Sequence, residues 1–133
     1  MTVRTARIGT RDPDALDVTR KSGGPTGSAF APSWRLLAPY LDKRRAGALT
    51  GADWAEYVER YTEEMRASYR AHPEAWAWLL SRPRIVLTCY CTDPERCHRR
   101  VLARILVRLG AEDGGEVGAM TAPAGAGRLP REE

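Results

Sequence analysis

Residues 84–110 constrain the fold more than any other part of this sequence. Residues 84–90 have the sequence RIVLTCY, which is apolar in the middle and rich in β-branched side chains, as is typical of a strand covered on both faces. Asp93 is suited to cap a helix, Pro94 suits its first position, and an apolar helical face then continues until Gly110. A buried strand, a short loop and a helix in this order predict an α/β fold.

The remaining elements are consistent with this class. Alternating or β-branched side chains predict short strands over residues 3–8 and 15–19. Ser33 is suited to cap a helix that carries Trp34, and Pro39 is expected to kink or shorten that helix because it lacks a backbone donor. Residues 74–80 predict one more short helical segment after a break at residues 72–73.

The clearest helix is predicted from a repeat of large apolar residues with acidic and basic residues between them. Thr50 and Asp53 resemble a capping box at its start. Helical spacing relates the apolar residues Trp54, Tyr57, Val58, Tyr61 and Met65. Core packing explains these aromatic side chains best.

We therefore predict a small three-layer α/β sandwich with a mostly parallel sheet flanked by helices. Residues 1–118 form its single domain, since 133 residues with 43% hydrophobic and 29% charged side chains suit one globular core. Residues 21–28 are rich in glycine and predict a loop, and residues 119–133 predict a flexible C-terminal tail.

Composition narrows the cellular setting. The start of the chain has no apolar signal segment, and no apolar run approaches the roughly 20 residues that cross a bilayer. The three cysteines leave one unpaired in any disulfide scheme, which favours reduced thiols, metal ligands or a catalytic thiol over a disulfide framework. We expect a cytoplasmic protein without membrane partners.

The chemistry is expected in residues 91–100, between the predicted central strand and the helix after it. Ligands in α/β sheets bind outside the carboxyl ends of strands, where a helix start attracts anions and favours thiolates. Cys97 or Cys91 is a candidate nucleophile, with Cys97 and His98 the preferred catalytic residues. Neighbouring helical residues point about 100° apart, so Cys97 and His98 do not automatically pair, and a base from elsewhere is an alternative.

Two other interpretations of these residues stay open. Zinc is one, because Cys89, Cys91, Cys97 and His98 are ligands it accepts in tetrahedral geometry, although their spacing is not that of a paired knuckle. In the other, the cysteines pack as small apolar residues and His98 donates a structural hydrogen bond. We predict no metal and no cofactor.

Arginine is prominent on the last helix, and the net charge is +4. Four arginines at four-residue spacing form a stripe that would meet nucleic-acid phosphates or remain solvated. They are Arg96, Arg100, Arg104 and Arg108. A nucleic-acid-binding module is therefore an alternative function.

Several of these segments together resemble the DUF488 family, over residues 3 to about 117. The most specific are residues 86–90, the Cys97-His98-Arg99 signature and, for one branch of the family, residues 16–23 and 30–34. Tyr61, Met65 and residues 115–117 match looser family patterns. Many relatives carry glutamate in place of Cys91, which weakens a metal site that needs this residue. The resemblance implies an α/β fold with a pocket and no established reaction.

The leading hypothesis joins the two motif groups in one pocket for a phosphate- or carboxylate-bearing ligand, with catalysis left open. One side comprises Asp17, Arg20, Lys21 and Ser22, and the other Cys89, Cys97, His98 and Arg99. The arginines would orient the anion, and Cys97 or His98 would carry any chemistry. A zinc-stabilised interaction domain is the third possibility, and the oligomeric state stays open.

Overall fold

The computed structural model describes residues 1–118, so the tail predicted over residues 119–133 lies outside the described residues. The order of elements is β1 (Thr2–Arg7), β2 (Ala15–Asp17), α1 (Gly24–Gly27), the 3-10 turn η1 (Ser28–Phe30), α2 (Trp34–Arg45), α3 (Gly51–Ala71), α4 (Pro73–Leu80), β3 (Arg84–Cys89), α5 (His98–Arg108) and β4 (Glu112–Glu116). Among the helices of this part of the chain, none is long and apolar enough to cross a membrane.

The four strands form one sheet in the order β2-β3-β1-β4, and all three neighbouring pairs are parallel. The predicted α/β class with a parallel sheet is confirmed. β3 lies between β2 and β1, and its residues from Ile85 to Cys89 are all buried, as the apolar segment predicted. The carboxyl ends of β1, β2 and β3 therefore meet at one edge of the sheet.

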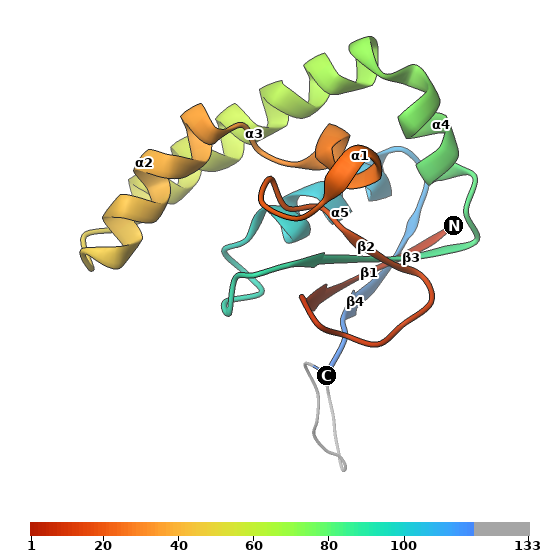
Figure 1. Cartoon of the computed structure of the whole chain (residues 1–133), viewed down its shortest axis with the longest axis horizontal. Helices are drawn as coiled ribbons and strands as arrows, with labels where there is room; N and C mark the ends of the chain where they lie inside the picture. Colours follow the sequence, from red (N-terminus) through yellow and green to blue (C-terminus); the bar gives the residue numbers. More distant parts are fainter. Residues whose placement is uncertain (119–133) are drawn as a thin grey trace.

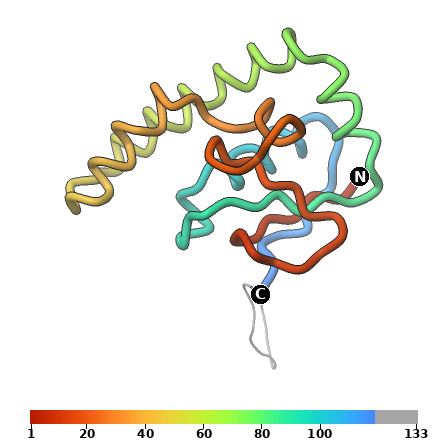
Figure 2. The backbone as a smooth tube through the Cα atoms, viewed as in Figure 1, coloured from red at the N-terminus to blue at the C-terminus, as the bar shows by residue number. Residues whose placement is uncertain are grey.

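Helices are stacked on the sheet in successive layers (Figure 1). α5 packs against β1, β3 and β4, and α3 packs against α5. α2, α3 and α4 form an arch over α5 and the sheet, which is also clear in the backbone trace (Figure 2). This arrangement is the small α/β sandwich that the sequence predicted.

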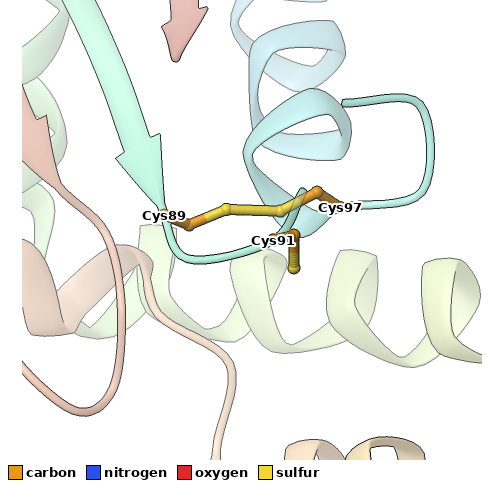
Figure 3. Close-up of side chains that lie close together, drawn as sticks. All are labelled: Cys89, Cys91 and Cys97. Carbon is orange, nitrogen blue, oxygen red and sulfur yellow. A yellow bond between two sulfur atoms is a disulfide. The ribbon is translucent and has the colours of Figure 1, made fainter. Parts of the chain in front are cut away.

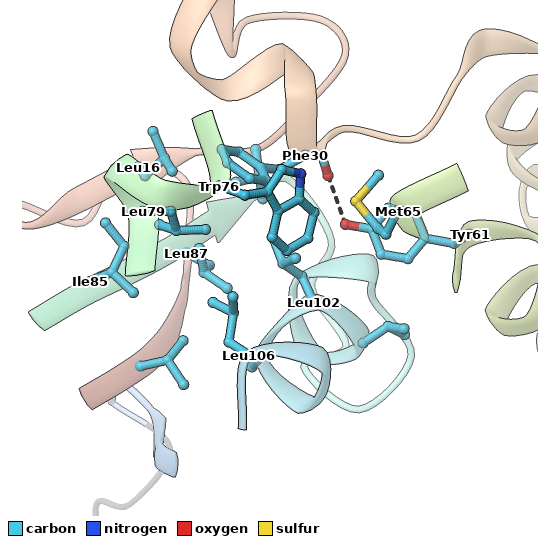
Figure 4. Packing of buried hydrophobic residues seen from close by; sticks show 14 of the residues in the cluster. Leu16, Phe30, Tyr61, Met65, Trp76, Leu79, Ile85, Leu87, Leu102 and Leu106 are labelled. Atoms are coloured by element: carbon cyan, nitrogen blue, oxygen red, sulfur yellow. Dashed lines mark hydrogen bonds between the residues drawn. The ribbon is translucent and has the colours of Figure 1, made fainter. Parts of the chain in front are cut away.

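The core lies between the sheet, α5 and the arch (Figure 4). Leu87 of β3, Leu102 of α5 and Trp76 of α4 are each at most 2% exposed. Trp76 packs edge-on against Phe30, with the ring centroids 5.1 Å apart. Each such side chain contributes roughly 1.5–3 kcal/mol by its removal from water.

α3 follows the sequence prediction closely. The side chain of Thr50 accepts a hydrogen bond from the backbone of Asp53, and the Asp53 carboxylate accepts one from the backbone of Thr50, which completes the predicted capping box. Tyr57, Tyr61 and Met65 are buried. The hydroxyl of Tyr61 donates to the carbonyl of Phe30 at 2.7 Å, so a polar group in the core is satisfied (Figure 4).

The start of α5 differs from the prediction, and this difference shapes the site. Asp93 does not cap the helix: its carboxylate accepts from the backbone N–H of Glu95 at 2.9 Å within a loop, and α5 begins at His98 with Cys97 as its N-cap. The local turn at Asp93 satisfies the same side-chain oxygen that a helix cap would have used. The Cys-His-Arg signature consequently stands in the first turn of α5, next to the end of β3.

Two smaller predictions also needed correction, and one strand was not predicted. Residues 21–28 contain the short helix α1 within the predicted loop, with Pro25 in its first turn. α2 is not shortened by Pro39 and continues to Arg45. β4 was not predicted, because its sequence EDGGE has no strand pattern, and it exists through its pairing with β1.

Candidate functional site

The residues after β2 and the loop after β3 meet at the carboxyl edge of the sheet. The hydroxyls of Ser22 and Tyr90, one from each segment, lie 2.8 Å apart. A pocket of about 520 Å³ opens beside them, between this edge and helices α2 and α3. Its lining residues are Thr19, Arg20, Lys21, Trp34, Leu37, Tyr40, Leu41, Arg44, Arg45, Trp54, Tyr57, Cys89, Tyr90, Cys91, Arg96, Cys97 and His98.

All three cysteines line this pocket, and their side chains lie close together between the end of β3 and the start of α5 (Figure 3). Their sulfur atoms lie within 4.8 Å of one another. Cys89 and Cys97 are joined by a disulfide and are each 1% exposed, whereas Cys91 is a partly exposed free thiol. The disulfide differs from the reduced thiols that composition favoured, and it arises because the end of β3 and the start of α5 are neighbours in space.

Arg99 lies beneath the sulfur cluster formed by Cys89, Cys91 and Cys97. Its guanidinium Nη1 donates to Cys89 Sγ at 3.1 Å, to Cys97 Sγ at 3.5 Å and to the carbonyl of Cys91 at 2.9 Å. The side chain is fully buried. A buried positive charge therefore contacts both sulfurs of the disulfide.

Glu116 of β4 balances that charge. Arg99 Nε donates to Glu116 Oε1 at 3.2 Å, and Nη2 donates to Oε2 at 2.8 Å. The hydroxyl of Thr5 on β1 also donates to Glu116, at 2.6 Å. This two-point contact holds the guanidinium in one orientation, a geometry in which arginine and carboxylate are matched. Sequence reasoning noted Glu116 only as part of a loose family ending and did not link it to Arg99.

Asp17 and Ser22 organise the residues after β2 and are not among the pocket-lining residues. Asp17 accepts from the backbone and hydroxyl of Thr19 at 2.9 and 2.6 Å and from the hydroxyl of Ser22. These contacts engage both carboxylate oxygens. Asp17 thus supports Ser22, whose hydroxyl reaches Tyr90, and its role in ligand binding stays a prediction.

Arg20 and Lys21 line the pocket as predicted. The guanidinium of Arg20 donates to the backbone carbonyls of Ser28, Ala31 and Pro32 at 3.0–3.1 Å, so it also holds the chain that leads into α2. Lys21 is exposed, with its ammonium 5.8 Å from the ring centroid of Tyr90. Of these two residues, Lys21 is the one whose charged group is left to meet a ligand directly.

His98 lines the pocket and is almost completely buried. Its Nε2 lies 2.8 Å from the carbonyl of Val18, which makes Nε2 the protonated nitrogen, and its ring meets Tyr61 edge-on. Burial lowers the pKa of His98 to about 4, so the imidazole is neutral at pH 7. In this state it can accept a proton at Nδ1 and cannot donate one as an imidazolium.

The sequence did not identify the opposite wall, which α2 and α3 supply. Arg44 Nη1 donates to Cys91 Sγ at 3.4 Å. Tyr40 and Tyr57 are buried in the wall, and burial raises the pKa of both phenols above 10.0. The helical repeat on α3 signalled a buried face, and nothing in it distinguished contact with the core from contact with a pocket.

The charges that line the pocket are all positive: within residues 1–118, no aspartate or glutamate is among the lining residues. Arg45 forms an exposed ion pair with Asp42 at 3.5 Å. In the same described part of the chain, Lys21, Arg44 and Arg96 have no carboxylate within 4.0 Å. Such a lining attracts an anion and disfavours a cation.

The residues of the zinc alternative are only partly brought together. The three sulfurs converge, but in the described part of the chain His98 is not within ligand distance of them, since its Nε2 contacts Val18. A disulfide also occupies two of the sulfurs, and a guanidinium touches both. In the disulfide form Cys91 is the one sulfur of this cluster free to act as a ligand, so this state lacks the four ligands of a structural zinc site, and the zinc alternative stays a prediction for the reduced protein.

The arginine stripe of the nucleic-acid alternative is interrupted. Arg96 precedes α5 and lines the pocket, and Arg100 pairs with Asp113 at 3.3 Å. Arg104 lies 3.9 Å from Glu95, with 58% of its side chain exposed. Arg96, Arg100 and Arg104 therefore do not form a continuous row of unpaired cations along α5.

A family model matches most of the chain. Residues 6–110 match the family model DUF488-N3a, which is described as the active DUF488-N3 subclade. No curated protein and no solved structure gives a significant match. The matched region covers most of the 133 residues, including β2, β3 and the whole of α5. This chain belongs to the DUF488 family.

Proposed function

We propose that this protein binds a phosphate- or carboxylate-bearing ligand in the pocket between β3, α2 and α3. The observation that carries the proposal is the sign of the lining: cations contributed by three separate segments and, within residues 1–118, no carboxylate. Lys21, Arg44 and Arg96, which have no carboxylate within 4.0 Å among residues 1–118, are the groups that would meet the anion. Arg20 and Arg45 add positive charge while they are engaged by other protein groups.

A titration with simple anions tests this proposal. Isothermal calorimetry with inorganic pyrophosphate and with succinate compares wild type, the double variant R44A/R96A, and Arg104→Ala. Arg104 has the same charge and is not a pocket-lining residue. We expect R44A/R96A to weaken binding by tenfold or more and Arg104→Ala to change it by less than twofold. Failure of both anions to bind wild type at millimolar concentration would overturn the proposal.

A second, narrower proposal is that the sulfur cluster makes the protein an enzyme once its disulfide is reduced. The contacts of Arg99 with Cys89 and Cys97 favour this role, because an adjacent cation stabilises a thiolate. The description of the matched subclade as active also supports it. The anion-binding proposal does not depend on this step.

The reaction would proceed in two stages. A dithiol reductant gives two electrons and two protons to the Cys89–Cys97 disulfide and itself becomes a disulfide, which leaves two protein thiols. Loss of one proton to solvent produces the Cys97 thiolate. Its sulfur then forms a bond to the electrophilic phosphorus or carbon of the ligand, and the leaving group departs with the electron pair of the bond that breaks. His98 Nδ1 is available to accept a proton nearby.

Covalent trapping tests the narrower proposal. Reduced protein is mixed with nitrophenyl phosphate or nitrophenyl acetate, and nitrophenol release and intact mass are followed. We expect a burst and a mass adduct in wild type, both absent from Cys97→Ser. Cys91→Ser is the matched control and should retain the burst. No burst from the reduced wild type with either compound would contradict nucleophilic catalysis by Cys97.

A further inference from the structure

We infer that the anion taken by this pocket is a nucleoside phosphate, whose base lies against the aromatic wall while its phosphate meets the cations. This inference rests on the anion-binding function proposed above and specifies the class of ligand. It is argued from the size of the pocket, from its aromatic side chains and from the position of its charges.

The pocket is much larger than an inorganic anion requires. A water molecule takes up about 30 Å³ in the liquid, and an inorganic phosphate corresponds to only a few waters. The pocket measures about 520 Å³, which falls in the range of roughly 300–1,000 Å³ typical of sites for small organic ligands. The ligand therefore has a substantial part besides its charged group.

Aromatic rings identify the nature of that part. Five aromatic side chains line the pocket: Trp34, Tyr40, Trp54, Tyr57 and Tyr90. Three of them, Tyr40 on α2 and Trp54 and Tyr57 on α3, are in mutual contact, with ring centroids 4.4 Å apart for Tyr40 and Tyr57, and 5.7 Å apart at an angle of 14° for Trp54 and Tyr57. Aromatic side chains gathered in this way can stack against the flat ring of a ligand, such as a nucleic-acid base.

Two of these rings are about half exposed to solvent. Trp34 is 53% exposed at the start of α2, and Tyr90 is 46% exposed after β3. Tyr and Trp combine an apolar ring with a polar group and are enriched where a protein contacts a partner. Both rings line the same pocket, so a ligand base placed there would cover surface that is otherwise in contact with water.

The positively charged side chains of the lining lie close to its aromatic rings. The Lys21 ammonium is 5.8 Å from the centroid of the Tyr90 ring, and Arg44 follows Tyr40 by one turn of α2. A ligand that engages both features has a flat ring and an anion separated by a short linker. The absence of carboxylates from the lining, within residues 1–118, disfavours a cationic aromatic amine on electrostatic grounds.

Calorimetry with a graded set of ligands tests the inference. The probes are the four nucleoside 5′-monophosphates of adenosine, guanosine, cytidine and uridine, with ribose 5-phosphate as the probe that lacks a base. We expect at least one nucleotide to bind wild type about tenfold or more tightly than ribose 5-phosphate, as stacking of one base provides. Equal affinities for ribose 5-phosphate and all four nucleotides would overturn the inference.

Two tryptophan variants assign the effect to the pocket. Trp34→Ala should lose the preference for the nucleotide and retain ribose 5-phosphate binding within twofold. Trp78→Ala is the control, because Trp78 is 39% exposed on α4 and is not a pocket-lining residue. A nucleotide preference that survives Trp34→Ala unchanged would contradict stacking on this ring.

The same data separate this inference from the proposed function. If ribose 5-phosphate binds and the nucleotides bind no better, only the nucleoside inference fails. If ribose 5-phosphate, pyrophosphate and the nucleotides all fail to bind, the anion-binding function itself fails.

When a nucleotide does bind, a 5′-phosphorylated oligonucleotide distinguishes two sources of the ligand. If the oligonucleotide binds more tightly than the mononucleotide and salt weakens its binding steeply, the ligand is the end of a strand. If the two bind equally, the ligand is a free nucleotide.

Discussion

Arg99 and Glu116 form a two-point ion pair that connects the last strand to the sulfur cluster. The Arg99 side chain is fully buried, its Nη2 lies 2.8 Å from Glu116 Oε2, and its Nε lies 3.2 Å from Oε1. The remaining guanidinium nitrogen contacts the sulfurs of Cys89 and Cys97. The edge strand β4 therefore supplies the group that orients the charge next to the disulfide.

Glu116→Ala should lower the free energy of unfolding by about 3–5 kcal/mol, because it leaves a buried guanidinium without its counter-charge. Urea denaturation measures the change. Glu112→Ala is the control from the same strand. Among residues 1–118 its carboxylate makes only an exposed contact with Thr2 at 3.5 Å, so a change within about 0.5 kcal/mol is expected. Equal effects of the two substitutions would contradict the role assigned to the ion pair.

His98 should make the protein less stable in weakly acidic solution. Burial lowers its folded-state pKa to about 4, below the unfolded value of 6.5, so its contribution to stability is fully present above pH 6.5. As pH falls from 6.5 toward 4 the unfolded chain binds a proton that the folded state excludes. Up to about 3 kcal/mol is lost over that window.

Unfolding free energies at pH 7 and pH 5 in wild type and His98→Gln measure this contribution. The variant should lose part of the pH dependence. His72→Gln is the control, because His72 is exposed at the junction of α3 and α4. A pH dependence in His98→Gln as large as that of wild type would show that other groups are responsible.

Alkylation should distinguish Cys91 from the other two cysteines. Without reductant, iodoacetamide should label Cys91 alone, since it is the free thiol and partly exposed. After treatment with a dithiol reductant all three cysteines are open to labelling, with Cys89 and Cys97 slower because each is 1% exposed. Peptide-level mass spectrometry reads out each site. Full labelling of Cys89 and Cys97 before reduction would show that their sulfurs are not bonded in solution.

Gly27→Ala should disturb the segment that carries Asp17. A Cβ at Gly27 would lie 1.8 Å from the carbonyl oxygen of Asp17, so one of the two backbones must move. We expect a loss of about 1–3 kcal/mol in stability and weaker pyrophosphate binding. Gly51→Ala at the start of α3 meets open space and should leave both properties intact. Unfolding and calorimetry of both variants provide the comparison, and a silent Gly27→Ala would contradict the close approach.

Local signals predicted the elements that depend on nearby residues. The capping box of Thr50 and Asp53 and the apolar repeat on α3 act within a few turns of one helix, and both predictions are confirmed. The apolar sequence of β3 likewise predicted a buried central strand. Asp93 shows the limit of this reasoning, since two local conformations can use the same side-chain oxygen and only the surrounding chain selects one.

By itself the sequence determined the α/β class, the parallel sheet and the segment after β3 in which the cysteines, His98 and Arg99 occur. Periodicity and local hydrogen bonding act over short distances along the chain, and these features depend on them. Only the tertiary structure decided that Cys89 bonds to Cys97, that Arg99 meets Glu116 and that aromatic rings of α2 and α3 face the same pocket as the sulfurs. Each of these contacts joins separate elements, and their side chains meet only after the strands have paired and the helices have packed.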